Sequence, residues 1–368
     1  MTIRELQASF AAWRDARKSL VLASVYDTEG STYSKSGARM LIAADATFQG
    51  MLSGGCLEGD LAERAVAVLE TNTPQCVTYD LGRNFDELWG LGVGCDGVMR
   101  IFLQPLLPEQ DYEPFATMAS VLSGDSEGIA ATVLESEHAS IAAGASLVVC
   151  DGEVASFGVP GVHHEAFMSA SQEAAAGMKS GTRLLDIDGQ KVKVLMARLV
   201  PPPSLLVLGG ALDAQPVLRL AVELGWRVTV QDHRPGYIER GGFSAADRVT
   251  CLAADEIAGV LPLDRFDAVV VMSHHLATDR KYLKILEKTQ IPYIGLLGPP
   301  DRRSRLMEDL GDAAKGLEYR LHGPAGFDIG ADGPASIALS ILAEIHETLH
   351  TGAGALARVS SRVSSTRG

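Results

Sequence analysis

The spacing of apolar residues changes along the first third of the chain and predicts a helix followed by strands. Over 3–13 apolar residues recur at helical spacing, and the apolar run at 20–27 that follows is typical of a buried strand. The stretch 28–39 is polar and rich in Gly and Ser, which indicates a loop, and 40–43 predicts the next strand. The chain therefore begins with an amphipathic helix that leads into a sheet.

Two glycines and a cysteine precede the second predicted helix. Apolar residues fall on one helical face over 57–68, so Ser53, Gly54, Gly55 and Cys56 stand at the N-terminus of that helix. A helix N-terminus offers unpaired N–H groups and the positive end of the helix dipole, and both favour an anion such as a phosphate or a thiolate. The alternative is a packed cysteine beside a tight turn.

The rest of the first half divides into two parts. Strands at 75–80 and around 99–103, with a loop at 81–97 between them, complete a small α/β domain over 1–107. Over 108–200 the pattern changes, because Asp-Gly pairs stand between alternating apolar runs. This is a strong hairpin signal and predicts an α+β, partly antiparallel middle segment.

Three consecutive prolines at 201–203 predict a linker, since neither a helix nor a sheet ladder continues through them. Beyond them a buried strand at 205–208, a glycine turn, a helix and a strand at 227–232 form a βαβ unit, and further strands and helices alternate after it. We predict a Rossmann-like domain with a parallel sheet over 204–350. The Gly/Ser-rich tail at 351–368 is expected to be disordered.

Composition and charge narrow the possible partners. The chain has 368 residues, 46% of them hydrophobic, and a formal net charge of -14, which disfavours nucleic acid and anionic membranes. The N-terminus lacks the apolar core of a signal peptide and carries Glu5 and Asp15, and no apolar run is long enough to span a membrane. We therefore expect a cytoplasmic protein.

The cysteines argue against both a disulfide framework and a structural zinc site. They form an odd set without a C-x-x-C pair, so we expect free thiols and no metal site. The five positions are Cys56, Cys76, Cys95, Cys150 and Cys251.

Other polar residues are candidates for ligand contacts. Lys35 and Arg39 flank the Gly/Ser-rich loop and could pair with a phosphate, or could be solvated charges. Cys95 lies in a second glycine-dense loop, which could equally be a turn that requires positive φ. His274 and Arg302 follow two strands of the predicted parallel sheet, where such sheets bind ligands, although a lone histidine is often structural.

The turn after the first Rossmann strand departs from the dinucleotide-binding pattern. In G-x-G-x-x-G the second glycine lets the pyrophosphate approach, but here Gly209 is followed by Ala211 and Ala214 at the second and third positions. Dinucleotide binding with Asp232 on the adenine ribose stays one possibility. A turn that only joins strand to helix is the other.

Seven blocks, in order, resemble the XdhC/CoxI family of xanthine dehydrogenase accessory proteins. They are GSTYSKSGARMLI, MLSGGCLEGDLAERA, GLGVGCDGVMRIFLQPL, LGGALDAQPVLRLAVELGWRVTVQDHRP, VVMSHHLATDRKYL, IPYIGLLGPPDRRSRL and GFDIGADGPASIALSILAEI. The resemblance implies an N-terminal XdhC/CoxI domain and a C-terminal Rossmann domain. It also implies a chaperone that binds and protects a molybdopterin-type molybdenum cofactor, assists its sulfuration by a cysteine desulfurase, and inserts it into a xanthine dehydrogenase-like molybdenum hydroxylase.

The resemblance assigns the glycine-cysteine block to Gly54, Gly55 and Cys56, and the second cysteine loop to Cys95. Where the family often has Gly-Ala-Gly-His, this chain has Gly209, Gly210, Ala211 and Leu212. We predict no catalytic residue and a homo-oligomer, with an NAD(P)-dependent oxidoreductase or a pure protein adaptor as alternatives. The predicted cofactor contacts are Gly30, Ser31, Lys35, Arg39, Ser53, Gly54, Gly55, Cys56, Glu58, Cys95, Gly209, Gly210, Ala211, Asp213, Asp232, His274 and Arg302.

Overall fold

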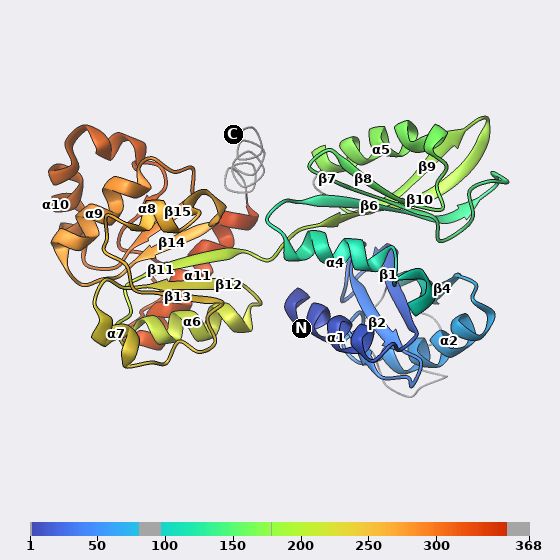
Figure 1. The fold of residues 1–368 in the computed structure, drawn as a ribbon, viewed down its shortest axis with the longest axis horizontal. Coiled ribbons are helices and arrows are strands. Elements are labelled where there is room, and N and C mark those ends of the chain that lie inside the picture. Colours follow the sequence, from blue (N-terminus) through green and yellow to red (C-terminus); the bar gives the residue numbers. More distant parts are fainter. Residues whose placement is uncertain (1, 81–96, 178, 352–368) are drawn as a thin grey trace. The chain divides into compact units, whose positions relative to one another are not determined.

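The structure is a computed structural model, and it describes residues 2–80, 97–177 and 179–351 (Figure 1). The chain divides after Pro201 into two compact units. Both segments that we assigned to 1–107 and 108–200 fall in the first unit, and the Rossmann-like segment forms the second. The predicted disordered tail lies outside the described residues, except for Thr351.

The first unit begins with a five-stranded antiparallel sheet in the order β3-β2-β1-β5-β4. Its elements are α1 (Ile3–Asp15), β1 (Leu20–Gly30), β2 (Arg39–Ala43), β3 (Phe48–Gln49), α2 (Glu58–Thr71), β4 (Gln75–Asp80) and β5 (Gly97–Leu106). The predicted loop at 28–39 is shorter in the structure, because β1 stays paired with β5 as far as Gly30 opposite Gly97. The helix and strands predicted for this segment are present.

A second antiparallel sheet, in the order β8-β7-β6-β10-β9, completes the first unit. Its elements are η1 (Pro108–Gln110), α4 (Phe115–Ser123), β6 (Gly128–Ser136), β7 (Ser146–Cys150), β8 (Glu153–Phe157), η2 (Gly161–His163), α5 (His164–Ala176), β9 (Gly181–Ile187) and β10 (Gln190–Leu199). The two Asp-Gly pairs form the turns of the β7-β8 and β9-β10 hairpins, which confirms the predicted hairpins.

The two sheets share a core, and this explains why they form one unit. Apolar residues of α1 and α4 pack between them together with Leu22 and Leu41 of the first sheet and Val148 of the second. Helix α2 covers the other face of the first sheet, and α5 covers the other face of the second (Figure 1).

The second unit is a six-stranded parallel sheet in the order β13-β12-β11-β14-β15-β16. Numbered from β11, this is the strand order 3-2-1-4-5-6 of dinucleotide-binding folds. Its elements are β11 (Ser204–Leu208), α6 (Ala214–Glu223), β12 (Arg227–Gln231), α7 (Pro235–Glu239), β13 (Arg248–Thr250), α8 (Ile257–Val260), η3 (Leu263–Arg265), β14 (Ala268–Val271), α9 (Leu276–Leu286), β15 (Tyr293–Leu296), α10 (Pro300–Leu310), η4 (Gly311–Gly316), β16 (Leu321–His322) and α11 (Pro334–His350).

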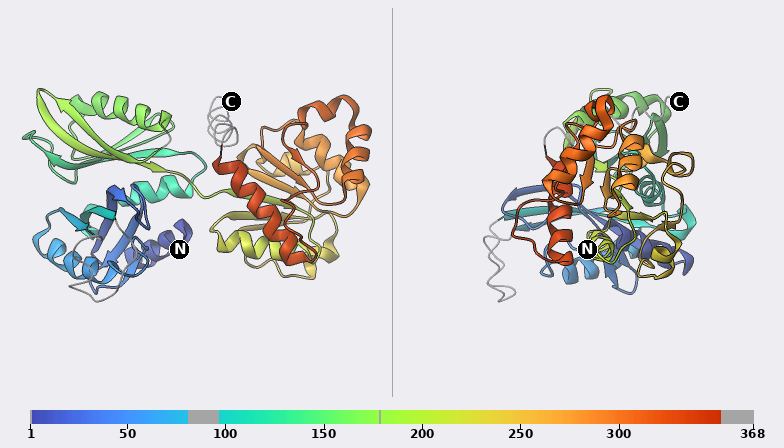
Figure 2. Two further views of the ribbon diagram at one scale, coloured as in Figure 1. Left: turned by 180° about the vertical axis from the view of Figure 1, so that it is seen from behind. Right: turned by 90° about the vertical axis from the view of Figure 1, so that its left-hand side faces the viewer.

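Helices cover both faces of this sheet (Figure 2). Helices α6 and α11 pack on one face and α8, α9 and α10 on the other, and each face has its own apolar core. The continuous apolar runs of β11 and β14 are fully buried, as expected for strands covered on both sides. The predicted Rossmann-like fold is confirmed.

Candidate functional site

The turn before α2 is built around the carboxylate of Glu58. One oxygen, Oε1, accepts hydrogen bonds from the amides of Leu52 at 2.8 Å and Ser53 at 2.9 Å. The other, Oε2, accepts from the amides of Gly55 at 3.0 Å and Leu57 at 3.2 Å, and from the Ser53 hydroxyl. The turn therefore encloses an anion that belongs to the chain itself.

This arrangement corrects the expectation that the helix start offers all its amides to an external anion. The amides of Ser53, Gly55 and Leu57 are already bound by Glu58. Burial acts to raise the pKa of Glu58, but the hydrogen bonds from Ser53 and Leu52 outweigh it and hold this pKa below its usual value. With 2% of its surface exposed, Glu58 shapes the turn from inside rather than facing a ligand.

The glycines of the turn face outward. Gly54 and Gly55 have φ values of 80° and 110°, which side chains rarely adopt, and both are exposed. A Cβ on Gly55 would meet no atom within 4 Å. The thiol-bearing Cys56 is partly exposed. Among the described residues, the amides of Gly54 and Cys56 have no hydrogen-bond acceptor, so two donors stay available beside the thiol.

The Gly/Ser-rich loop after β1 lies against this turn. A Cβ on Gly54 would be 3.5 Å from the Tyr33 ring, and the Ser34 hydroxyl donates to the Met51 carbonyl at 3.4 Å. Lys35 is exposed, with its Nζ 3.3 Å from the Thr32 hydroxyl. We call Tyr33, Ser34, Lys35, Gly54, Gly55 and Cys56 the loop cluster. Two segments that the sequence singled out separately thus form one exposed surface.

Three other predicted residues of this unit lie elsewhere in the structure or outside it. Gly30 and Ser31 are exposed at and just after the end of β1. Cys95 lies outside the described residues.

Arg39 has no place in the loop cluster. By strand alternation its side chain lies on the Leu41 face of β2, whereas Met40 packs under α2. Burial lowers the pKa of Arg39 to about 10. One buried terminal nitrogen of its guanidinium has no hydrogen-bond partner in the described part of the chain.

In the Rossmann unit, the turn after β11 is held close to the neighbouring strand. Gly209 has a φ of 140°, and a Cβ there would be 2.3 Å from the carbonyl oxygen of Met272. The Gly210 amide donates to Asp232 at 2.7 Å, and Ala211 follows with part of its surface exposed. Gly209 is therefore required for packing between strands, whether or not a ligand binds.

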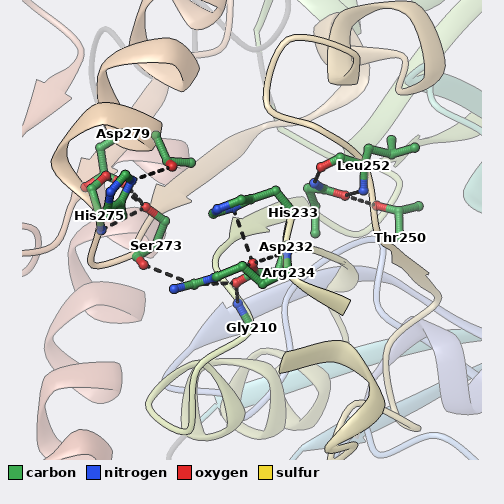
Figure 3. A network of polar contacts seen from close by, with 11 residues as sticks. Gly210, Asp232, His233, Arg234, Thr250, Leu252, Ser273, His275 and Asp279 are labelled. Atoms are coloured by element: carbon green, nitrogen blue, oxygen red, sulfur yellow. Dashed lines mark hydrogen bonds and ion pairs between the residues drawn. The ribbon is translucent and has the colours of Figure 1, made fainter. Parts of the chain in front are cut away.

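Asp232 is fully buried and fully engaged (Figure 3). Its Oδ1 accepts from the Arg234 amide and from Arg234 Nε, both at 2.9 Å. Its Oδ2 accepts from Gly210 and from Arg234 Nη2, both at 2.7 Å. The Arg234 guanidinium also donates to the Ser273 carbonyl at 3.1 Å and lies 3.7 Å from the centre of the Tyr237 ring. Arg234 thus occupies the carboxylate that would bind an adenine ribose, which corrects the expected role of Asp232.

Two further predicted residues form ion pairs at the carboxyl edge of the sheet. His274, with a φ of 59°, places Nε2 2.7 Å from Oδ2 of Asp213, so it ties the end of β14 to the turn before α6. Arg302 donates to the buried Asp279 at 2.5 Å. Asp279 in turn accepts from the Ser273 hydroxyl, a contact visible in Figure 3.

A cavity of about 750 Å³ opens at the same edge, between the N-terminal parts of α6 and α11. Its walls are mostly apolar, and its lining includes Asp213, Val217, His274, Phe327, Ile337 and Ser340. One oxygen of Asp213 is buried there without a hydrogen-bond partner in the described chain. Of the predicted Rossmann contacts, Asp213 and His274 line this cavity, whereas Asp232 and Arg302 do not.

Sequence reasoning missed three residues that shape these sites. Arg234 stands two positions after Asp232 and Asp279 lies in the first turn of α9, so charge of opposite sign nearby was the available signal. Tyr33 gave no signal except an aromatic residue in an otherwise polar loop.

A two-sheet unit with a Gly-Gly-Cys turn, followed by a Rossmann unit, defines a protein class built from two α/β modules. Residues 205–345 match the family described as the XdhC Rossmann domain, and residues 13–80 match the XdhC and CoxI family. The chain belongs to the XdhC and CoxI family.

Relatives cover most of the chain. It is 29% identical over 328 residues to a Bacillus subtilis protein named as a probable xanthine dehydrogenase subunit, and the match covers 89% of this chain and 92% of that protein. It is 30% identical to "Uncharacterized protein YqeB" of Escherichia coli, covering 42% of this chain but only 29% of that protein. A crystal structure described as a xanthine dehydrogenase from Bacillus halodurans is 26% identical, with a TM-score of 0.77 over 94% of this chain and 95% of that one.

No helix in the described part of the chain has the length and apolar character needed to cross a membrane.

Proposed function

We propose that this chain binds the molybdenum cofactor as cargo and serves the maturation of a xanthine dehydrogenase-type molybdenum hydroxylase. Family membership and a relative whose name is that of a probable xanthine dehydrogenase component, matched over nearly its whole length, support this role. The observation that carries the proposal is the turn at Gly54, Gly55 and Cys56. It is held open from inside by Glu58 and presents a thiol and two unbound amides outward.

The loop cluster fits the chemistry of such a cargo. The cofactor is an anionic dithiolene that carries molybdenum and a terminal phosphate. The soft sulfur of Cys56 suits a soft metal centre, and the amides of Gly54 and Cys56 suit an anionic group. The Lys35 ammonium adds a mobile positive charge next to them. With a net charge of -14, the chain needs such local donors, because its overall field repels an anion.

In this proposal the chain acts as a carrier and not as an enzyme. It shields the cofactor from water and oxygen, presents it to a cysteine desulfurase for sulfuration, and passes it to the hydroxylase. Cys56 is the residue placed nearest the molybdenum, while Glu58 only positions the turn.

The alternative role as an NAD(P)-dependent oxidoreductase has weaker support. Arg234 already occupies both oxygens of Asp232, and Ala211 narrows the approach to the turn. We expect no saturable change in NAD(P)H fluorescence when the chain is titrated. A saturable change that vanishes in Asp213→Asn would instead assign the Rossmann cavity to a nucleotide.

The binding role is tested by equilibrium ultrafiltration of the full chain with isolated molybdenum cofactor under anaerobic conditions, with bound molybdenum measured by mass spectrometry. We expect near one equivalent for the parent and at least tenfold weaker binding for Cys56→Ala. The control Cys76→Ala removes another exposed thiol and should bind like the parent. Equal binding by Cys56→Ala and the parent would remove Cys56 from the site.

A further inference from the structure

The second sheet of the first unit brings together two histidines and an aspartate that are far apart in sequence. His138 follows β6, His163 is the last residue of η2, and Asp188 is in the turn of the β9-β10 hairpin. Because the three residues come from separate segments, their sequence spacing matches no metal-binding motif. Cysteine spacing alone led to the expectation of no metal site.

The ligand atoms of these residues converge. His138 Nε2 lies 3.6 Å and His163 Nδ1 3.9 Å from the same oxygen, Oδ2 of Asp188. All three candidate ligand atoms lie within 4.8 Å of one another, and the two imidazole rings meet edge to face with centres 4.9 Å apart. Both separations from Asp188 exceed a normal hydrogen bond, so hydrogen bonding does not explain the cluster.

These separations are close to those around a tetrahedral metal ion. Metal–ligand bonds of about 2.0–2.1 Å place neighbouring ligand atoms about 3.3 Å apart. The two histidine side chains are nearly buried, at 13% and 10% exposure, whereas Asp188 is 72% exposed in a hairpin turn. Asp188 can therefore move the remaining few tenths of an ångström toward the histidines without disturbing the core.

We propose that His138, His163 and Asp188 bind a divalent transition-metal ion such as Zn²⁺, with a fourth position left open to water or another ligand. Imidazole nitrogen favours Zn²⁺, Co²⁺, Ni²⁺ and Cu²⁺ over Mg²⁺ and Ca²⁺, which prefer sites made of oxygen ligands. Two neutral imidazoles and one carboxylate leave a net positive charge on the bound centre, which suits an additional anionic ligand.

The surroundings of His138 orient it for this role. Its Nδ1 lies 3.1 Å from the Ser140 hydroxyl and 3.3 Å from the Ser140 amide, and its own amide donates to the Ser136 hydroxyl at 3.0 Å. When Nε2 binds a metal, the ring proton sits on Nδ1, where the Ser140 hydroxyl can accept it. Without metal, the Ser140 amide can donate to Nδ1 instead.

A bound ion would link three segments of the second sheet: the loop after β6, η2, and the β9-β10 turn. Because such an ion binds the folded state only, the melting temperature of the full chain should rise as the metal concentration is increased.

The site is tested by titrating the metal-free full chain with Co²⁺ and following visible absorption, which is intense for four-coordinate Co²⁺. Ligation by nitrogen and oxygen gives no sulfur-to-cobalt charge-transfer band, so binding at a cysteine is recognised separately. We expect one equivalent for the parent. In His163→Ala and Asp188→Asn we expect affinity reduced about tenfold or more, since even the loss of outer-shell partners costs that much.

Asp151→Asn is the matched control, because Asp151 occupies the same left-handed position in the β7-β8 Asp-Gly turn. It should bind Co²⁺ like the parent. Melting temperatures without metal report whether each variant is folded. Equal affinity in the parent, His163→Ala and Asp188→Asn would overturn the proposal, as would a spectrum dominated by thiolate ligation. Neither result bears on cofactor binding at Cys56.

Discussion

At the scale of single residues, two buried carboxylates organise the sites. Glu58 binds the amides of the turn before α2, and Asp232 binds Arg234 and the Gly210 amide. Each replaces an external anion that the sequence pattern led us to expect. A carboxylate that accepts several hydrogen bonds is costly to remove, because its donors are then left buried and unpaired.

Glu58→Gln should destabilise the protein by about 2 kcal/mol, since a neutral amide cannot accept from all the donors that the carboxylate binds. The free energy of unfolding from urea titration measures this loss. Glu63→Gln, an exposed position on the same helix, is the control and should leave stability unchanged. Equal stability of the two variants would show that Glu58 does not hold the turn.

The same carboxylate predicts a dependence on pH. Because the folded-state pKa of Glu58 is lowered, its contribution is fully present above the unfolded-state pKa of about 4.3 and is lost as the pH falls through the folded value. The stability difference between the parent and Glu58→Gln should therefore shrink on acidification. Urea titrations at neutral and acidic pH measure it, and a difference that stays constant or grows contradicts this assignment.

Arg234→Ala should cost about 3 kcal/mol, because it leaves the fully buried Asp232 without its cation. The matched control is Arg240→Ala, an exposed arginine whose guanidinium lies 5.5 Å from the centre of the same Tyr237 ring. Thermal unfolding of the two variants gives the comparison. Similar melting temperatures would mean that water or another donor replaces Arg234.

At the scale of elements, the contact between β11 and β14 limits the Rossmann turn. Gly209→Ala places a methyl group 2.3 Å from the Met272 carbonyl oxygen at a φ that alanine avoids, so we expect a loss of about 3 kcal/mol. Gly236→Ala, where a Cβ meets no atom within 4 Å, should not destabilise the fold. The two free energies of unfolding test this, and a neutral Gly209→Ala would contradict the close packing.

The sequence predicts elements well where the signal is local. Helix α1, the Asp-Gly hairpins and the βαβ unit follow from periodicity and turn residues within short windows. It does not predict which distant groups meet. The partner of Asp232 was two residues away and was overlooked, whereas the convergence of His138, His163 and Asp188 depends on how three segments fold together.

The site shows the same division. Exposed glycines beside Cys56 were predicted from the motif, and the structure adds Tyr33 and Lys35 from a loop about twenty residues earlier in the chain. Arg39 belongs to the same motif block, yet strand alternation places its side chain on the opposite face of the sheet from α2. A motif identifies residues, but the face each side chain occupies follows from the register of its strand.

At the scale of the whole molecule, the chain combines a two-sheet unit that carries the loop cluster with a Rossmann unit that carries a largely apolar cavity. In the proposed role the first supplies the thiol beside the cargo. A net charge of -14 then restricts anionic cargo to sites with their own donors, so its binding should weaken only modestly with added salt.

The most direct test of the carrier role is transfer of the cofactor to an apo-hydroxylase of the xanthine dehydrogenase type. Full chain loaded with cofactor should restore activity under air faster and to a higher final level than the same amount of free cofactor, and Cys56→Ala should give no such advantage while Cys76→Ala retains it. If free cofactor restores activity equally well with or without the chain, the protein is not a carrier of this cofactor.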